Sequence, residues 1–319
     1  MRTTGPYDLD KDVQRVLGHV PKPRKKAAKS EQLSLFGPGY EIVEQPRLYE
    51  TTDGLVVDVE DSAFARAVSL HSSEKAECAR RYAQIVGTAM KSWYTVWIEL
   101  FAGPGKLYVR ETGKFVPGSP VEALNIPRQF NRYVFSDLNP ACTESLRRRV
   151  GNTHGVHVLR GDANSPELLV EIANLVPRDS LVVLYGDPEG LHLHWNTIKF
   201  FIDRYPHLDL LLNVPISGVV RAVAAGYEEK AAAVMNHPQP SALFDAGARD
   251  KGVRYREWYW RNCEAAGFDQ IAAVPVCLKG TTRELYDLML ASRNPLASKF
   301  FRIAAGLPAD APIALSKPA

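Results

Sequence analysis

Acidic and amide side chains recur along this chain, each soon after a short apolar run. The runs are rich in β-branched and aromatic residues, which is typical of buried parallel strands. A carboxylate is costly to bury unless it accepts hydrogen bonds, for example from hydroxyl or amino groups. We therefore expect one ligand site that gathers the polar residues at the ends of five such runs, namely Glu99, Asp137, Asp162, Asp187 and Asn213.

A glycine-containing loop, Phe101-Ala102-Gly103-Pro104-Gly105, follows the first of these runs. Glycine lets the backbone approach a ligand closely, and an acid after the second strand of a nucleotide-binding sheet accepts from both ribose hydroxyls. The sequence contains neither G-x-x-x-x-G-K-[S/T] nor, in this loop, G-x-G-x-x-G, so an adenosyl group without a pyrophosphate fits better. The cofactor we expect is S-adenosylmethionine, bound by Glu99, Phe101, Ala102, Gly103, Gly105, Asp137 and Asp162.

A second set of polar residues follows the fourth and fifth runs, in Asp187-Pro188-Glu189-Gly190 and after Asn213-Val214-Pro215. Ligands of open α/β sheets bind where the strand order reverses, so these residues are expected to face the transferred group. Helix capping by Asp187 and a surface ion pair of Arg221 are the structural alternatives. Two carboxylates can also act as acid and base, or chelate a hard cation. The predicted catalytic residues are Asp187, Glu189, Asn213 and Arg221.

The apolar runs alternate with helical patterns, which predicts the elements that position these residues. Parallel neighbours need crossover connections, so the alternation indicates an α/β fold with a doubly wound, Rossmann-like, mostly parallel sheet. We expect strands over 94–101, 132–136, 156–159, 181–185 and 208–213, with helices over 119–128, 140–150, 165–176 and 195–205 between them.

Further elements are expected on both sides of this core, giving a domain over residues 47–305 and a tail over 306–319. A hairpin around Thr52-Asp53-Gly54 leads into the domain, and a helix over 73–93 follows with Ser73 as its N-cap. After a helix over 254–267, two antiparallel strands over 270–277 and 283–291 close one edge of the sheet.

Residues 1–46 have several prolines and little apolar periodicity, which predicts a flexible or loosely docked arm. One short amphipathic segment interrupts it, Gln32-Leu33-Ser34-Leu35-Phe36. A basic run is typical of a solvated arm, with contact to nucleic-acid phosphates as the alternative. Its members are Lys22, Arg24, Lys25, Lys26 and Lys29.

The composition is that of a globular protein, with 45% hydrophobic and 24% charged residues among 319. A net charge of +3 does not by itself indicate nucleic acid as a partner. No apolar run approaches the ~20 residues that span a bilayer and the start has no signal-peptide core, so a cytoplasmic protein is expected. The four cysteines lack metal-ligand spacing and are predicted to be buried and reduced.

Several segments from about residue 74 to 301 resemble the three-Cys-motif partner proteins. They are 99–105, Gly118-Ser119-Pro120-Val121-Glu122-Ala123-Leu124, 187–190, 213–215 with Arg221, and the region from Leu285-Tyr286-Asp287-Leu288 to Ser292-Arg293-Asn294-Pro295-Leu296. The resemblance implies a Rossmann-like fold of the class I methyltransferase type. It also implies a separate partner that bears the three cysteines and is similar to radical S-adenosylmethionine enzymes.

The glycine loop also resembles the cofactor loop of DNA methyltransferases, whereas the predicted catalytic segment departs from their patterns. Amino-methyltransferases carry Asp, Asn or Ser followed by Pro-Pro and an aromatic residue, and this chain has Asp187-Pro188-Glu189-Gly190. Cytosine-C5 enzymes use a Pro-Cys nucleophile, and no cysteine here follows a proline. Base methylation by either route is therefore not indicated.

Residues 32–36 resemble the pentapeptide by which bacterial replication and repair proteins bind the sliding clamp. The resemblance implies that leucine and phenylalanine fill an apolar pocket while glutamine anchors a neighbouring site. Three functions stay open: a methyltransferase acting on DNA or a nucleotide-like substrate and recruited by the clamp, an inactive Rossmann-like adaptor in DNA repair, and a metal-dependent nuclease using Glu99, Asp187 and Glu189.

Overall fold

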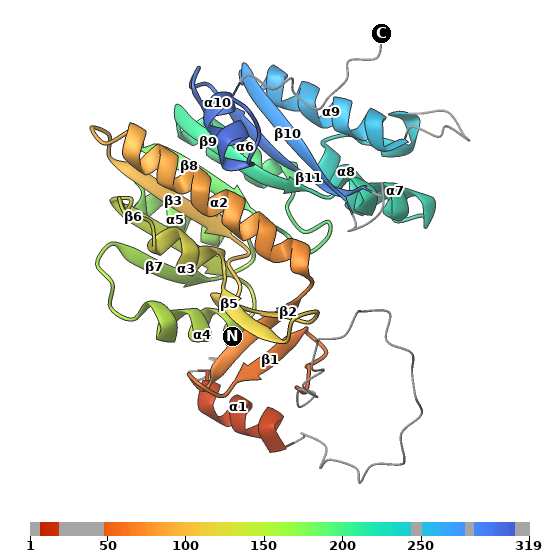
Figure 1. Ribbon diagram of the computed structural model, residues 1–319. Coiled ribbons are helices and arrows are strands. Elements are labelled where there is room, and N and C mark those ends of the chain that lie inside the picture. Colours follow the sequence, from red (N-terminus) through yellow and green to blue (C-terminus); the bar gives the residue numbers. More distant parts are fainter. Residues whose placement is uncertain (1–6, 19–47, 244–250, 278–283, 310–319) are drawn as a thin grey trace, which may run out of the picture.

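The computed structural model describes residues 7–18, 48–243, 251–277 and 284–309 (Figure 1). Seven strands form its main sheet in the order β10-β11-β9-β8-β3-β6-β7. Their bounds are β3 Thr95–Leu100, β6 Arg132–Asp137, β7 Val156–Arg160, β8 Leu181–Gly186, β9 His207–Val214, β10 Gln270–Cys277 and β11 Glu284–Ser292. In the described ranges, no helix has the length and apolar character needed to cross a membrane.

The pairing of the strands confirms the predicted fold class. The chain moves outward from β3 to β6 and β7, then returns to β8 and β9 on the other side, so the order reverses between β3 and β8. These five strands are parallel, whereas β11 is antiparallel to both β9 and β10. This is a doubly wound, Rossmann-like sheet of the methyltransferase type. Of the two predicted edge strands, only β11 runs antiparallel to the five parallel strands.

Helices cover both faces of the main sheet because its strands are apolar on both faces. Along β3, Val96 and Ile98 belong to one buried cluster and Trp97 to the other. Helix α2 crosses the front of the sheet in Figure 1. The helices are α2 Leu70–Ala89, α3 Ser119–Leu124, α4 Pro140–Val150, α5 Pro166–Leu175, α6 Trp195–Arg204, α7 Ile216–Ala224, α8 Glu228–Met235, the 3-10 helix η1 Pro240–Leu243, α9 Lys251–Ala265 and α10 Ala297–Ala304.

A second, smaller sheet has the order β1-β2-β4-β5, formed by β1 Leu55–Asp58, β2 Ala63–Val68, β4 Lys106–Val109 and β5 Lys114–Pro117. The sequence patterns did not predict its β4–β5 hairpin, which leaves the main fold after Gly105 and returns at Gly118, whose N–H donates to the Gly105 carbonyl at 2.9 Å. The β4–β5 hairpin is therefore inserted directly after the glycine loop, between Gly105 and Gly118.

Two local predictions near the small sheet are wrong. Residues 52–54 do not join two strands, because they form a turn closed by Gly54 N–H on the Thr51 carbonyl, and β1 pairs instead with β2. Helix α2 begins at Leu70, with Ser69 rather than Ser73 as its N-cap.

The expected flexible arm over residues 1–46 needs a further correction, because its start is a packed helix. Helix α1, Leu9–Gly18, buries Leu9, Val13 and Val16 against the small sheet and α4. These residues are spaced i, i+4 and i+7, which is a helical periodicity. The prediction missed it because it was based on the prolines farther along the segment. The basic run at 22–29 and the pentapeptide at 32–36 lie outside the described residues.

Candidate functional site

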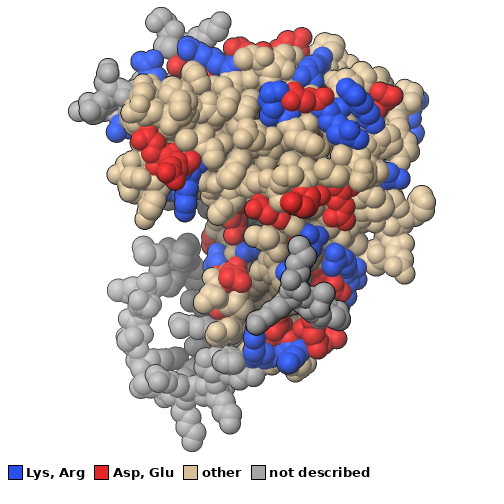
Figure 2. All heavy atoms as spheres, turned by 180° about the vertical axis from the view of Figure 1, so that it is seen from behind, with Lys and Arg blue, Asp and Glu red and all other residues tan. Residues whose placement is uncertain are grey.

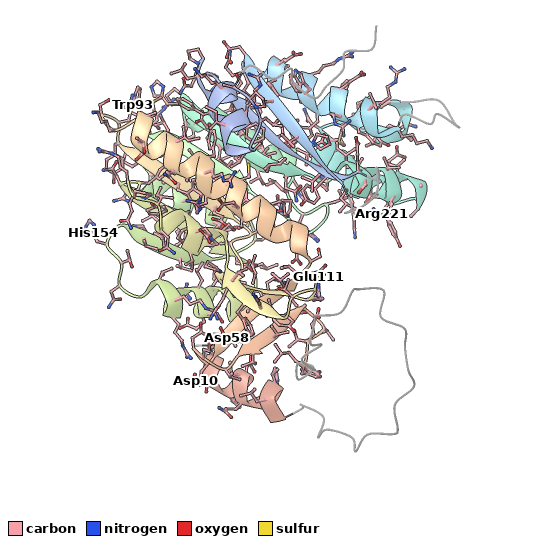
Figure 3. The ribbon with its side chains drawn as sticks, in the orientation of Figure 1. Asp10, Asp58, Trp93, Glu111, His154 and Arg221 are labelled. Atoms are coloured by element: carbon pink, nitrogen blue, oxygen red, sulfur yellow. The ribbon has the colours of Figure 1, made fainter. Side chains whose placement is uncertain are left out.

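A cavity of about 740 Å³ lies at the carboxyl ends of the parallel strands. The loops after β3, β6, β7, β8 and β9 line it, and residues of α2, α7 and the small sheet complete its wall. Figure 3 shows Arg221 extending from α7 on the side of the molecule where the small sheet lies. Ten of the eleven predicted site residues line this cavity: Phe101, Ala102, Gly103, Gly105, Asp137, Asp162, Asp187, Glu189, Asn213 and Arg221. Their roles remain predictions.

The two glycines of the loop differ in what surrounds them. Both have positive φ, 64° at Gly103 and 81° at Gly105, a conformation that L side chains rarely adopt. A Cβ added at Gly103 would meet no atom within 4 Å, whereas one at Gly105 would lie 2.7 Å from Leu146 Cδ1. Gly103 therefore leaves open space toward the cavity, and Gly105 permits close packing against α4. Phe101 also has positive φ, 64°, which costs roughly 1–2 kcal/mol.

Asp137 joins the loops after β3 and β6. Its Oδ2 accepts from the Gly103 N–H and its Oδ1 from the Asn139 N–H, both at 2.8 Å. A carboxylate offers about four acceptor positions, so both oxygens retain capacity for hydroxyls of a ligand.

Leu138 lines the cavity directly after this acid, and 64% of its surface is exposed. Sequence reasoning missed Leu138, although an apolar residue beside a strand-end acid was a visible signal. Its exposed surface can cover an apolar or aromatic part of a ligand.

The loop after β7 is held mainly by Asn164, a residue that sequence reasoning missed. Its side chain accepts from the His194 N–H and Thr197 Oγ and donates to the His192 carbonyl, which fixes the loop against the start of α6. Asp162 is exposed, and its Oδ1 accepts from both the N–H and the Nδ2 of Asn164. The predicted adenine contact at Asp162 thus lies on an ordered turn at the cavity rim.

Glu99 does not line the cavity, contrary to the prediction. Only 1% of its surface is exposed, and its carboxyl accepts from Ser119 Oγ at 2.5 Å and from Trp97 Nε1 at 3.1 Å. Burial raises the pKa of Glu99 to about 8, with Asp187 adding to the rise and the two hydrogen bonds opposing it. Glu99 lies behind the wall and positions Ser119, which does line the cavity.

Asp187 lies at the end of β8 and is held by side chains from two other elements. Its Oδ1 accepts from Lys75 Nζ at 2.6 Å and Asn213 Nδ2 at 2.7 Å, and its Oδ2 faces the Tyr185 hydroxyl at 3.4 Å. Lys75 is only 10% exposed and lies 4.7 Å from the centre of the Tyr286 ring. Sequence reasoning missed Lys75, because no local pattern links a residue of α2 to the end of β8.

The other two predicted catalytic residues are more accessible. The Glu189 side chain is 72% exposed and accepts from Arg66 of the small sheet at 3.4 Å. Arg221 is exposed and donates to Ser217 Oγ at 3.3 Å, one turn earlier on α7. Both side chains lie at the cavity rim, where a bound substrate can displace these long hydrogen bonds.

The three carboxylates suggested for a metal-dependent nuclease, Glu99, Asp187 and Glu189, lie in different surroundings. Across the described residues, no group of three or more His, Cys, Asp or Glu side chains is arranged to hold a metal ion. Glu99 is buried behind the cavity wall, while Glu189 extends to Arg66.

Cys78, Cys142 and Cys263 are buried free thiols, as predicted, and burial raises the pKa of each to about 12.

No protein-family model matches this chain, and a search of curated proteins finds no match. Among solved structures, an O-methyltransferase from Bacillus cereus in complex with SAH is 12% identical, with 67% of this chain and 80% of that one covered at a TM-score of 0.39. The O-methyltransferase TomG from Streptomyces achromogenes in complex with SAM is 13% identical, with 71% and 91% covered at 0.39.

The protein LPL1258 from Legionella pneumophila is 12% identical to this chain, with 69% of this chain and 85% of that one covered at a TM-score of 0.46. Identities this low concern the fold and not what a chain binds. The fold itself is defined by the strand order of the main sheet, which is that of a Rossmann-like α/β protein of the methyltransferase type.

Proposed function

We propose that the cavity binds S-adenosylmethionine and that the chain is a methyltransferase. The observation that carries this proposal is the open space beside Gly103 at the point where the strand order reverses. Nucleotides bind at this position in doubly wound sheets. A volume of about 740 Å³ is within the range of small-molecule sites and leaves room for a second reactant.

The residues present fit the proposed cofactor. Asp137 offers acceptor positions for ribose hydroxyls, the exposed side chain of Leu138 can cover an adenine ring, and Asp162 at the rim can accept from its amino group. When bound, S-adenosylmethionine supplies an electrophilic methyl group. The chain's own contribution is to orient that group toward Asp187 and Asn213 and to exclude water from it.

Isothermal titration calorimetry with S-adenosylmethionine and S-adenosylhomocysteine tests the proposal. We expect both to bind the wild type, and Asp187→Ala to keep the affinity for S-adenosylhomocysteine within about threefold because Asp187 lies on the substrate side. Absence of binding to the folded wild type would refute the proposal. A large loss of cofactor affinity in Asp187→Ala would instead place Asp187 among the cofactor contacts.

A second candidate function is a non-catalytic adaptor, favoured by the Lys75–Asp187 ion pair. Lys75 already occupies one oxygen of the predicted catalytic carboxylate. On this hypothesis the chain binds the adenosyl ligand and escorts a three-Cys-motif partner similar to radical S-adenosylmethionine enzymes. Methyl transfer from labelled S-adenosylmethionine to nucleic acid, nucleotide or the partner would rule it out, whereas binding without transfer would favour it.

We further propose that residues 32–36 recruit the chain to the bacterial sliding clamp in DNA repair, although they lie outside the described residues. Burying Leu35 and Phe36 in a receptor pocket is worth roughly 1.5–3 kcal/mol each. Replacing both with alanine should abolish clamp binding in surface plasmon resonance and leave the melting temperature unchanged. An earlier melting transition would mean that the two residues pack on the chain's own fold instead.

Contact of the basic run, 22–29, with DNA is a separate proposal. On the face shown in Figure 2, the described Lys and Arg side chains are interspersed with Asp and Glu. A phosphate-binding contribution from the basic run should weaken steeply with salt. Neutralising Lys25 and Lys26 should then reduce the salt dependence of DNA binding.

A further inference from the structure

Asn213 has a buried acceptor atom that receives no hydrogen bond from any described residue. It is 6% exposed, lines the cavity, and donates from Nδ2 to Asp187 Oδ1 at 2.7 Å. A carboxylate without a proton can only accept, so this contact fixes which end of the amide is the donor. The Oδ1 of Asn213 is buried and has no hydrogen-bond partner within the part of the chain that the structure describes. Buried polar atoms are nearly always paired, so this oxygen indicates a donor on a ligand.

The position of Asn213 indicates which ligand would supply this donor. Asn213 lies on β9, and β8 separates this strand from β3, which carries the glycine loop. An adenosyl group beside Gly103 and Asp137 lies over β3 and β6, on the other side of β8. Asn213 therefore lies at the part of the cavity left for the second reactant.

Asp187 offers a second acceptor in the same place. Its Oδ1 is occupied by Lys75 and Asn213, whereas its Oδ2 has only a long contact with the Tyr185 hydroxyl, at 3.4 Å. Two acceptor oxygens on adjacent side chains suit a group with two hydrogens to donate. An amino group has two, a hydroxyl has one, and a carbon or thioether nucleophile has none.

We propose that Asn213 Oδ1 and Asp187 Oδ2 bind the amino group of a substrate, so that the methyl acceptor is a primary amine. The inference rests on the proposed function and adds a substrate class to it. Asn213 and Asp187 determine specificity here, since a methyl acceptor with fewer than two hydrogens to donate leaves one of the two oxygens unpaired. Lys75 positions the carboxylate from the opposite side.

Sinefungin is a suitable probe, because this adenosyl analogue carries an amine at the position of the transferred methyl group. S-adenosylhomocysteine lacks that amine, so the ratio of the two dissociation constants measures recognition of the amine. We expect the wild type to bind sinefungin about tenfold more tightly or better, since hydrogen bonds to charged groups are worth that much. Calorimetry provides both constants without any turnover.

The variants Asn213→Leu and Asn213→Ala should lose this preference and keep their affinity for S-adenosylhomocysteine within about threefold. Leucine is close in size to asparagine and apolar, so it suits a buried strand position. Asn262→Ala is the control. This variant also loses an amide hydrogen bond, the one that Asn262 Nδ2 donates to the Met235 carbonyl, but Asn262 is not among the cavity-lining residues. Its preference for sinefungin should match the wild type.

The outcomes separate the two proposals. If both ligands bind the wild type equally well, or if the Asn213 variants retain the preference, the amine site is refuted and cofactor binding stands. If neither ligand binds the wild type, the proposed function fails and the inference fails with it. Preference in the wild type and in Asn262→Ala, with loss in both Asn213 variants, supports the amine site.

Discussion

The two halves of the cavity are held together in different ways. In the adenosyl half, formed by the loops after β3, β6 and β7, the side-chain hydrogen bonds of Asp137, Asp162 and Asn164 join residues between 2 and 34 positions apart. In the acceptor half, around Asp187 and Asn213, two contacts are far more distant in sequence. Lys75 and Asp187 are 112 residues apart, and Arg66 and Glu189 are 123 apart.

The difference separates two kinds of site construction. The contacts of the adenosyl half join the successive loops at one edge of the parallel sheet, so this half forms together with the sheet itself. The acceptor half exists only when α2 and the small sheet pack onto the main fold. Substitutions in the first half should therefore change the affinity for the adenosyl ligand with modest effects on stability. Substitutions in the second half should change stability and the binding of the second reactant.

The largest expected effect tests the backbone of the adenosyl half. Gly103→Leu should weaken binding of S-adenosylhomocysteine at least 100-fold, because the side chain fills space that the ligand needs. Gly151→Leu is the matched control: Gly151, at the end of α4, also has positive φ and no atom within 4 Å of an added Cβ. Both variants should lose about 1–2 kcal/mol of unfolding free energy, and only the first should lose affinity in calorimetry.

An equal loss of affinity in the two glycine variants would contradict this view of the adenosyl half. It would mean that backbone strain anywhere in the domain disturbs the cavity. An unchanged affinity in Gly103→Leu would place the ligand elsewhere.

The next effect concerns the long-range ion pair of the acceptor half. Lys75→Met should lower the free energy of unfolding by about 1–3 kcal/mol, since it leaves Asp187 partly buried without its cation. Lys199→Met is the control, because the Lys199–Asp203 pair is 55% and 59% exposed and should contribute at most about 0.5 kcal/mol. Urea denaturation measures both, and equal losses would show that the buried pair does not organise this half.

Glu99 lies between the halves, in contact with Ser119 and in the field of Asp187, and its effect depends on pH. Its pKa, about 8 in the folded chain, exceeds the ordinary value of 4.5, so the folded state holds a proton that the unfolded state has released. The contribution of Glu99 to stability is therefore most favourable below about pH 4.5, and it falls between about pH 4.5 and 8 by at most about 1.4 kcal/mol per pH unit.

Glu99→Gln removes this titration. Relative to the variant, the wild type should become progressively less stable in urea denaturation from pH 5 to pH 8. If the unfolding free energies of the wild type and Glu99→Gln instead change in parallel with pH, Glu99 is already ionised at pH 5 in the folded chain. Glu144→Gln, which removes a partly exposed carboxylate of α4, should leave the wild-type slope nearly unchanged.

The smallest expected effect is at Leu138. Leu138→Ala should weaken S-adenosylhomocysteine binding about fivefold, corresponding to roughly 1 kcal/mol of lost apolar contact, and should not lower stability because the side chain is exposed. Val170→Ala, at an exposed position of α5 outside the cavity lining, should change neither quantity. Equal affinities for the Leu138 variant and the wild type would remove Leu138 from the binding surface.

The sequence was sufficient to predict the main sheet and the residues at its strand ends. Apolar runs with crossover helices specify parallel strands, and the carboxyl ends of parallel strands share one edge, so Gly103, Asp137, Asp162, Asp187 and Asn213 converge on one cavity. Their positions at the ends of the predicted strands were therefore sufficient to locate these residues. The same local patterns did not predict α1, whose three buried residues lie in a segment otherwise judged by its prolines.

Only the tertiary structure determined how the polar groups are paired. The burial of Glu99 behind the wall, the contact of Lys75 with Asp187 and the unsatisfied oxygen of Asn213 follow from the packing of α2 and β9 around β8. The small sheet reaches the cavity because the β4–β5 hairpin interrupts the chain at Gly105 and Gly118. Such contacts join residues far apart in sequence, and no local periodicity encodes which side chain meets which.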